Sequence, residues 1–192
     1  MSTLPPDPTP ADTRRSFLGK LAAAGAVLTL GRFFPAGAAA AAPAWVKGMA
    51  LDITFSVATE EGGRVKRPYV AVWIEDSAGK PVRTLTLWAQ TTGRGPRWIP
   101  DLRRWYRGNA DLLDTVSSAT RNPGTYAVAW DGKTDRGAAA PRGDYYVCIE
   151  SAREHGPYSL VRGKVTLGAS AFRKDLGTDG DIGAARVSYA KA

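Results

Sequence analysis

Two runs of apolar residues constrain the fold of this chain more than any other feature of its sequence. Every second residue from Leu51 to Val57 is apolar, which is typical of a β-strand that buries one face. The run over residues 67–76 is apolar at both odd and even positions, so it predicts a strand that lies centrally in its sheet. Turn-forming residues follow both runs, Gly62 and Gly63 after the first and residues 77–80 after the second.

Five further segments show strand-like alternation. They cover residues 82–88, 125–130, 143–150, 157–167 and 182–189, and Gly163 bends the fourth. About seven strands with little helix predict an all-β fold, namely an immunoglobulin-like antiparallel β-sandwich.

The strand pattern stops between residues 91 and 123. A loop of ~30 residues is unusual in a small domain, and such loops are commonly functional. Within it, residues 101–107 predict a short helix, with Asp101 near the end where the helix dipole favours an acid. We therefore expect one long loop that contains a short helix.

Composition limits the classes of function. The 192 residues carry a formal net charge of +8, which favours anionic partners. Cys148 is the only cysteine and His155 the only histidine, so the sequence argues against an internal disulfide, a multi-haem protein and a histidine-rich metal site. A hydrogen-bonded structural residue is the simplest interpretation of His155. No catalytic arrangement of serine, histidine and aspartate and no pair of catalytic carboxylates is found, so an enzyme is disfavoured.

The first 44 residues have the features of a twin-arginine export signal. Arg14 and Arg15 precede an apolar run over residues 21–30, and small residues follow over 36–44. The apolar run is short and contains glycine, so a membrane span is disfavoured, and an uncleaved anchor is the alternative. We expect cleavage near residues 40–44, a periplasmic location and a single sandwich domain over residues 45–192. An exported chain without a binding motif is not expected to bind nucleic acid.

Residues 114–120 form a short, hydroxyl-rich sequence that ends in Thr120. The order of Asp114, two variable residues, Ser117, Ser118, an alanine and the threonine resembles the acceptor motif of proteins that carry FMN covalently. The resemblance implies that a flavin transferase joins the FMN phosphate to Thr120 through a phosphoester, with Asp114 helping to bind the transferase or its metal. A threonine hydroxyl needs such activation, because it is a poor nucleophile by itself. The alternative is an ordinary polar turn.

Arginine and aromatic residues stand together shortly before this motif, as Arg103, Arg104, Trp105 and Tyr106. A flavin ring needs an aromatic or apolar surface and donors near the part that becomes negative on reduction. Arginine supplies such donors and stays charged. We therefore predict that these four residues hold the ring of an FMN on Thr120. The alternative is that Trp98 and Trp105 only pack the long loop onto the sandwich.

Three longer stretches, residues 67–75, 102–106 and 152–158, resemble a family of predicted periplasmic proteins of unknown function. The resemblance spans nearly all of residues 45–192. It implies an association with flavin transferases and with membrane reductases of the PepSY type that are linked to iron uptake. Residues 130–145 also resemble the hairpin of the immunoglobulin-like domain in flagellar hook-capping proteins.

Two functions follow from these patterns. The first is an exported electron-transfer protein with FMN on Thr120, which passes electrons between a membrane reductase and an acceptor such as ferric iron. The second is a non-enzymatic periplasmic binding or adaptor module of immunoglobulin-like fold.

Overall fold

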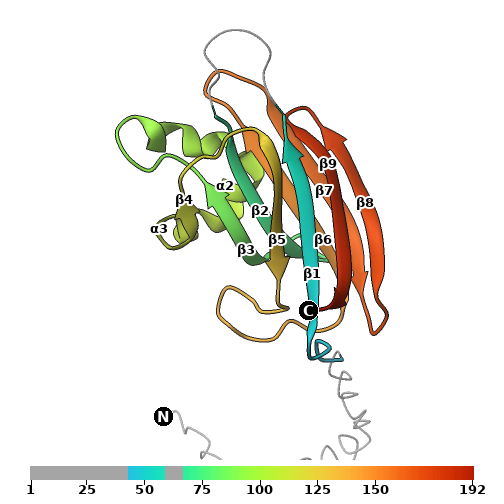
Figure 1. Cartoon of the computed structure of the whole chain (residues 1–192). Coiled ribbons are helices and arrows are strands. Elements are labelled where there is room, and N and C mark those ends of the chain that lie inside the picture. The colour runs from blue at the N-terminus through green and yellow to red at the C-terminus, as the bar shows by residue number, and fades with distance from the viewer. Residues whose placement is uncertain (1–42, 59–66) are drawn as a thin grey trace, which may run out of the picture. The chain divides into compact units, whose positions relative to one another are not determined.

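Two β-sheets pack face to face in the part of the chain that the structure describes, residues 43–58 and 67–192 of a computed structural model (Figure 1). The first sheet has the strand order β5-β1-β9-β8, and all its neighbouring strands are antiparallel. Its strands are β1 (Met49–Val57), β5 (Gly124–Trp130), β8 (Phe172–Asp179) and β9 (Ile182–Lys191).

The second sheet has the strand order β4-β3-β2-β6-β7. Its strands are β2 (Tyr69–Asp76), β3 (Pro81–Trp88), β4 (Ser117–Ser118), β6 (Gly143–Ala152) and β7 (Tyr158–Leu167). Only the short pairing of β3 with β4 is parallel. The prediction of an all-β sandwich is confirmed.

The order of the strands also matches an immunoglobulin-like sandwich. Strands β1 and β5 take the places of B and E, while β3, β2, β6 and β7 take the places of C′, C, F and G. Strand β9 lies beside β1, where strand A lies beside B. The hydroxyl of Tyr145, near the start of β6, donates to the carbonyl of Pro141 at 2.6 Å. A tyrosine that bonds back to the preceding backbone at this place is a recurrent feature of such domains.

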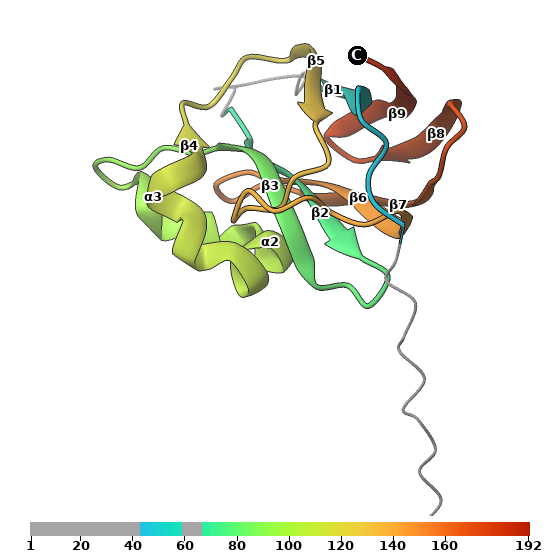
Figure 2. The ribbon, with the colours of Figure 1, turned by 90° about the horizontal axis from the view of Figure 1, so that it is seen from below.

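A helical segment follows β3 and covers the outer face of the second sheet (Figure 2). It consists of η1 (Gly95–Asp101), α2 (Arg103–Asn109), η2 (Ala110–Leu112) and α3 (Leu113–Val116). The sequence predicted a single short helix over 101–107, which corresponds to α2. It did not predict the short helical elements η1, η2 and α3 on either side.

This cover explains why β2 is apolar on both faces. Alternate residues of β2 point into the space between the sheets, where Val70, Val72 and Ile74 pack. Trp73 and its neighbours on the other face pack beneath the helical segment, against side chains such as Trp105. The prediction that this strand lies centrally is confirmed, because β3 and β6 flank it.

The structure adds two strands that the sequence did not predict. Strand β8 has few apolar residues, and it lies at the edge of the first sheet with Arg173, Lys174 and Asp175 exposed. Charged residues at an edge disfavour pairing with another chain, and they also hide the strand from a search for alternation. Strand β4 is two residues long and leaves no periodic signal.

The side chain of Trp45 packs the start of the described chain onto the sandwich. Its indole Nε1 donates to the carbonyl of Met49 at 3.0 Å, and its ring packs edge-on against Trp130 and Tyr189 at 5.0 and 5.6 Å. Gly132 lies directly against this ring, and a Cβ there would be 2.1 Å from an indole carbon. The predicted export signal lies outside the described residues except for its last two. No helix in the described ranges is both long and apolar enough to span a membrane.

Candidate functional site

The acceptor-like motif runs along the edge of the second sheet beside β3. Asp114 lies exposed on α3, which continues to Val116, and Ser117 and Ser118 then extend as β4. Ser117 and Ser118 pair with Leu87 and Trp88 in parallel register. The Ser118 hydroxyl donates to the carbonyl of Leu87 at 3.2 Å, so this half of the motif is held by the sheet.

Thr120 follows β4 and lies partly buried at the junction of two surface hollows. The first, here called the arginine hollow, has a volume of about 480 Å³. The second, the loop hollow, has a volume of about 380 Å³. Each volume is within the usual range for small-molecule sites. The arginine hollow is lined by Arg67, Tyr69, Gln90, Arg94, Gly95, Trp98, Thr120 and Glu154, and the loop hollow by residues 89–92 and 117–120.

The arginine hollow combines aromatic rings with positive charge. Tyr69 is buried, and its hydroxyl donates to the carbonyl of Gly95 at 3.0 Å. This burial raises the pKa of Tyr69, so it stays a neutral donor at physiological pH. Gly95 has no room for a side chain, because a Cβ would lie 2.2 Å from the carbonyl oxygen of Gln90. Arg67 and Arg94 are exposed at the rim.

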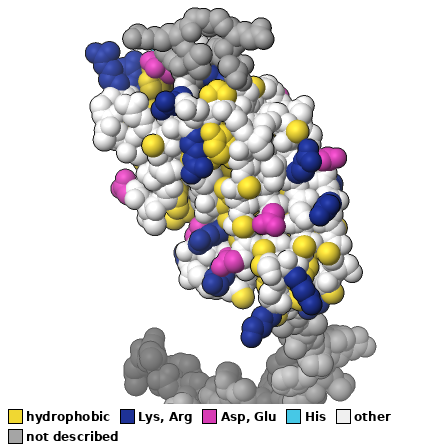
Figure 3. All heavy atoms as spheres, viewed as in Figure 1, with side chains coloured by type: hydrophobic (Ala, Val, Ile, Leu, Met, Phe, Trp, Pro, Cys, Tyr) yellow, Lys and Arg dark blue, Asp and Glu magenta, His cyan; other side chains and the backbone are white. Residues whose placement is uncertain are grey.

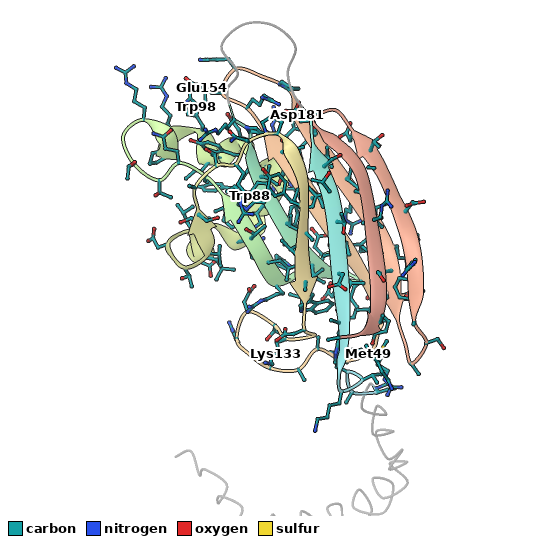
Figure 4. The ribbon with its side chains drawn as sticks, viewed as in Figure 1. Met49, Trp88, Trp98, Lys133, Glu154 and Asp181 are labelled. Carbon is teal, nitrogen blue, oxygen red and sulfur yellow. The ribbon has the colours of Figure 1, made fainter. Side chains whose placement is uncertain are left out.

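Trp98 forms one wall of the arginine hollow. The guanidinium of Arg97 lies 4.8 Å from the centre of its ring, and the ring of His155 meets it edge-on at 4.7 Å. Trp98 and Glu154 lie at the same end of the domain in Figure 4. Figure 3 shows Lys and Arg side chains at that end, with an acidic side chain beside them.

The four residues predicted to hold a flavin ring lie elsewhere, on α2. Trp105 is fully buried, and its indole Nε1 donates to the hydroxyl of Thr84 at 3.1 Å. Tyr106 is 38% exposed. The guanidinium of Arg103 lies 4.9 Å from the centre of the Tyr158 ring. None of the four lines either hollow that contains Thr120.

Arg104, the last of the four, belongs to an ion network. Its Nε and Nη2 donate to the buried carboxylate of Glu75 at 2.8 Å each. Arg162 and Trp73 donate to the same carboxylate at 2.9 and 3.1 Å. Burial alone would raise the pKa of Glu75, but the hydrogen bonds from Arg104 and Arg162 outweigh it and hold this pKa below its usual value. The guanidinium of Arg104 is therefore committed to the protein itself.

A second buried carboxylate, Glu150 on β6, fixes the start of α2. It accepts the backbone N–H groups of Arg104 and Trp105 at 2.8 Å each, which are groups that a helix leaves without internal partners. Burial raises the pKa of Glu150, and the two N–H donors only partly oppose this shift. Contacts inside the domain therefore fix the position of α2, and with it the side chains that α2 exposes.

The described residues contain no group of three or more His, Cys, Asp or Glu side chains placed to hold a metal ion. His155 has a left-handed backbone, with φ of 56°, and contacts Trp98. Cys148 is buried, and this burial raises the pKa of its thiol far above the usual range, so it stays protonated.

The sequence singled out Thr120 as a candidate and left Trp98 as a packing residue, and it did not identify the other residues that line the same hollow. Arg67, Tyr69 and Gln90 come from the ends of β2 and β3, and they share no motif with residues 114–120. The only available signal was that Arg67 and Tyr69 stand next to a strand end, where binding residues are often found.

Comparison with known proteins gives one match. The sequence profile of DUF2271, described as a predicted periplasmic protein, matches residues 50–184. No curated protein matches the chain, and neither does any solved structure. The matched range includes the helical segment, the acceptor-like motif and the strands of both sheets, apart from the first residue of β1 and most of β9. The chain therefore belongs to the DUF2271 family of predicted periplasmic proteins.

Proposed function

We propose that the protein is an exported electron-transfer protein that carries FMN on Thr120. In this proposal it leaves the cytoplasm by the twin-arginine route and exchanges electrons with a PepSY-type membrane reductase, with ferric iron as an acceptor. One observation carries the proposal. Thr120, the last residue of the stretch that resembles an FMN-acceptor motif, lines a surface hollow that also contains Tyr69, Trp98 and two arginines.

The attachment reaction balances with a flavin dinucleotide as donor. The Thr120 oxygen forms a bond to the phosphorus of the FMN half, the bond from that phosphorus to the bridging oxygen breaks, and AMP leaves. The hydroxyl proton passes to a base on the transferase. Ala119 and Ser118 are exposed and small, so the modifying enzyme can approach the chain at this point.

The residues of the arginine hollow fit a bound flavin. Flavins supply one- and two-electron transfer, and their ring gains negative charge on reduction. Tyr69 and Trp98 offer aromatic surface, while Arg67 and Arg94 offer permanent positive charge at the rim. This flavin site does not use the residues predicted on α2, because Trp105 and Arg104 form hydrogen bonds to Thr84 and Glu75 inside the domain.

A non-enzymatic binding module is the second candidate. The observation in its favour is the set of exposed arginines around the hollow, because such a surface also suits an acidic protein partner without any cofactor. Arg67 and Arg94 line the hollow and are exposed, and Arg97, which lies over the Trp98 ring, is exposed as well.

Co-expression of the full chain with a flavin transferase separates these candidates. We expect the intact protein to gain the mass of one FMN less one water, to turn yellow and to lose both properties in Thr120→Ala. Thr115→Ala is the matched control, since Thr115 is an exposed hydroxyl at a variable position of the same motif. If the wild-type chain stays colourless and the Thr120→Val variant binds a partner protein as well as the wild type does, the protein is a binding module. An FMN adduct that survives Thr120→Ala contradicts the attachment site.

A further inference from the structure

Both sides of Thr120 are tied to the sandwich. On the amino-terminal side, β4 pairs with β3, and the backbone N–H of Ala89 donates to the carbonyl of Ser118 at 2.8 Å. On the carboxy-terminal side, the hydroxyl of Tyr126 donates to the carbonyl of Asn122. Only Ala119, Thr120 and Arg121 lie between these two hydrogen-bonded positions.

Arg121 forms a further tie immediately after the acceptor residue. Its guanidinium lies 4.6 Å from the centre of the Trp88 ring and 5.5 Å from the centre of the Tyr126 ring. Those two rings also pack edge-on against each other at 4.6 Å, and Trp88 stacks on Phe55 in the core at 5.6 Å. Trp88 lies between the sheets in Figure 4. The arginine therefore joins the acceptor loop to the hydrophobic core.

From these contacts we propose that the flavin transferase recognises the folded edge of the sandwich, and that Arg121 is a positioning residue for Thr120. This inference rests on the function proposed above. The edge consists of β4, the turn through Asn122 and the first residues of β5. Its partner is the active-site opening of the transferase, which must take a bent loop with closely spaced ends rather than an extended peptide.

The alternative is recognition of the linear motif alone. In that case the order of residues 114–120 would suffice, and the contacts of Arg121 would not affect the reaction. The folded-edge proposal differs because contacts that hold the acceptor loop in one conformation raise the fraction of chains that the transferase can bind. The apparent affinity of the transferase for the chain scales with that fraction. It also agrees with twin-arginine export, since that route carries proteins that are already folded.

The test measures initial rates of FMN incorporation into the full chain as its concentration is varied. A cation–π contact at an exposed arginine corresponds to about a 2- to 10-fold effect when it involves one or two rings. We expect Arg121→Ala to raise KM for the chain by this factor while kcat stays near the wild-type value. Arg121→Lys should give an intermediate KM, because a lysine keeps the charge and loses the planar stacking group.

Two controls make the result decisive. Arg107→Ala removes another exposed arginine, on α2, and should leave KM unchanged. A synthetic peptide of residues 112–123 should be modified far less efficiently than the chain, although it contains the whole motif. Urea midpoints of the variants check that the fold is retained.

The outcomes separate the two proposals. A wild-type chain that gains no FMN overturns the proposed function, and this inference with it. A wild-type chain that is modified, with an unchanged KM in Arg121→Ala or with a peptide as efficient as the chain, overturns only the folded-edge inference. A loss confined to kcat would also overturn it, since positioning of the free loop acts on KM.

Discussion

Replacing Glu75 by glutamine tests the ion network beneath the helical segment. Glu75 is 2% exposed and accepts four hydrogen bonds, three of them from two arginines. Loss of one partner from a buried ion pair typically costs about 3–5 kcal/mol. Here water reaches the arginines, because the side chains of Arg104 and Arg162 are 38% and 28% exposed. We therefore expect Glu75→Gln to lower the free energy of unfolding by about 2–3 kcal/mol.

Urea unfolding followed by tryptophan fluorescence and far-ultraviolet circular dichroism measures this loss. The urea midpoint should fall with an unchanged m-value, and Tm should fall by about 5–10 °C for a domain of this size. Asp144→Asn, which breaks the exposed ion pair of Asp144 with Lys164, is the matched control and should leave the midpoint unchanged. A Glu75→Gln protein as stable as the wild type would refute the reasoning.

The pH dependence gives a second readout of the same variant. The pKa of Glu75 is lower in the folded state than in the unfolded state. Its contribution to stability is therefore present above the unfolded pKa and disappears as pH falls through the folded pKa. The difference in stability between wild type and Glu75→Gln should shrink on acidification. A difference that is constant from neutral to acidic pH contradicts this assignment.

Three further predictions concern α2. The pKa of Glu150 is raised in the folded state, so its contribution to stability is fully present below the unfolded pKa and decreases as pH rises through the folded pKa. The difference in stability between wild type and Glu150→Gln should therefore narrow as pH rises. A difference that widens with pH in urea titrations would contradict the raised pKa. Trp105→Ala should destabilise the protein by about 3–5 kcal/mol, as expected for a fully buried aromatic residue. Trp105→Phe should keep FMN incorporation at the wild-type level, because Trp105 does not line the hollows beside Thr120. A loss of incorporation in a Trp105→Phe protein that still folds would show that Trp105 belongs to the flavin site.

Much of the fold was predictable because most strands of the sandwich bury one face and leave a period of two in the sequence. The run at residues 67–76 even showed burial on both faces, which required a cover over the second sheet. Alternation does not show what provides that cover. The helical segment supplies it with a few large side chains from short successive elements, including Ile99 of η1, Leu102 between η1 and α2, and Trp105 of α2.

The candidate site was only partly predictable for the same reason. A sequence motif is local, so the resemblance of residues 114–120 to an acceptor motif could be noticed without a structure. A hollow is made by segments that are distant in the sequence, and Arg67 and Thr120 are more than fifty positions apart. The cluster at 103–106 has the composition of a ligand site, yet its tryptophan is buried and one of its arginines binds Glu75. Composition alone does not distinguish a surface arginine from one paired below it.

The packing of Trp45 limits how far the amino terminus can be trimmed. The backbone carbonyl of Pro43 accepts from the N–H of Arg142 at 2.7 Å, and that of Ala44 accepts from the Arg142 side chain at 2.8 Å. Cleavage by a signal peptidase before Pro43 would leave both hydrogen bonds to Arg142 in place. A cut after Trp45 would remove a ring that sits on Gly132, Trp130 and Tyr189, and would open the bottom of the sandwich to water. The predicted cleavage range at residues 40–44 thus overlaps the first residues that contact the sandwich.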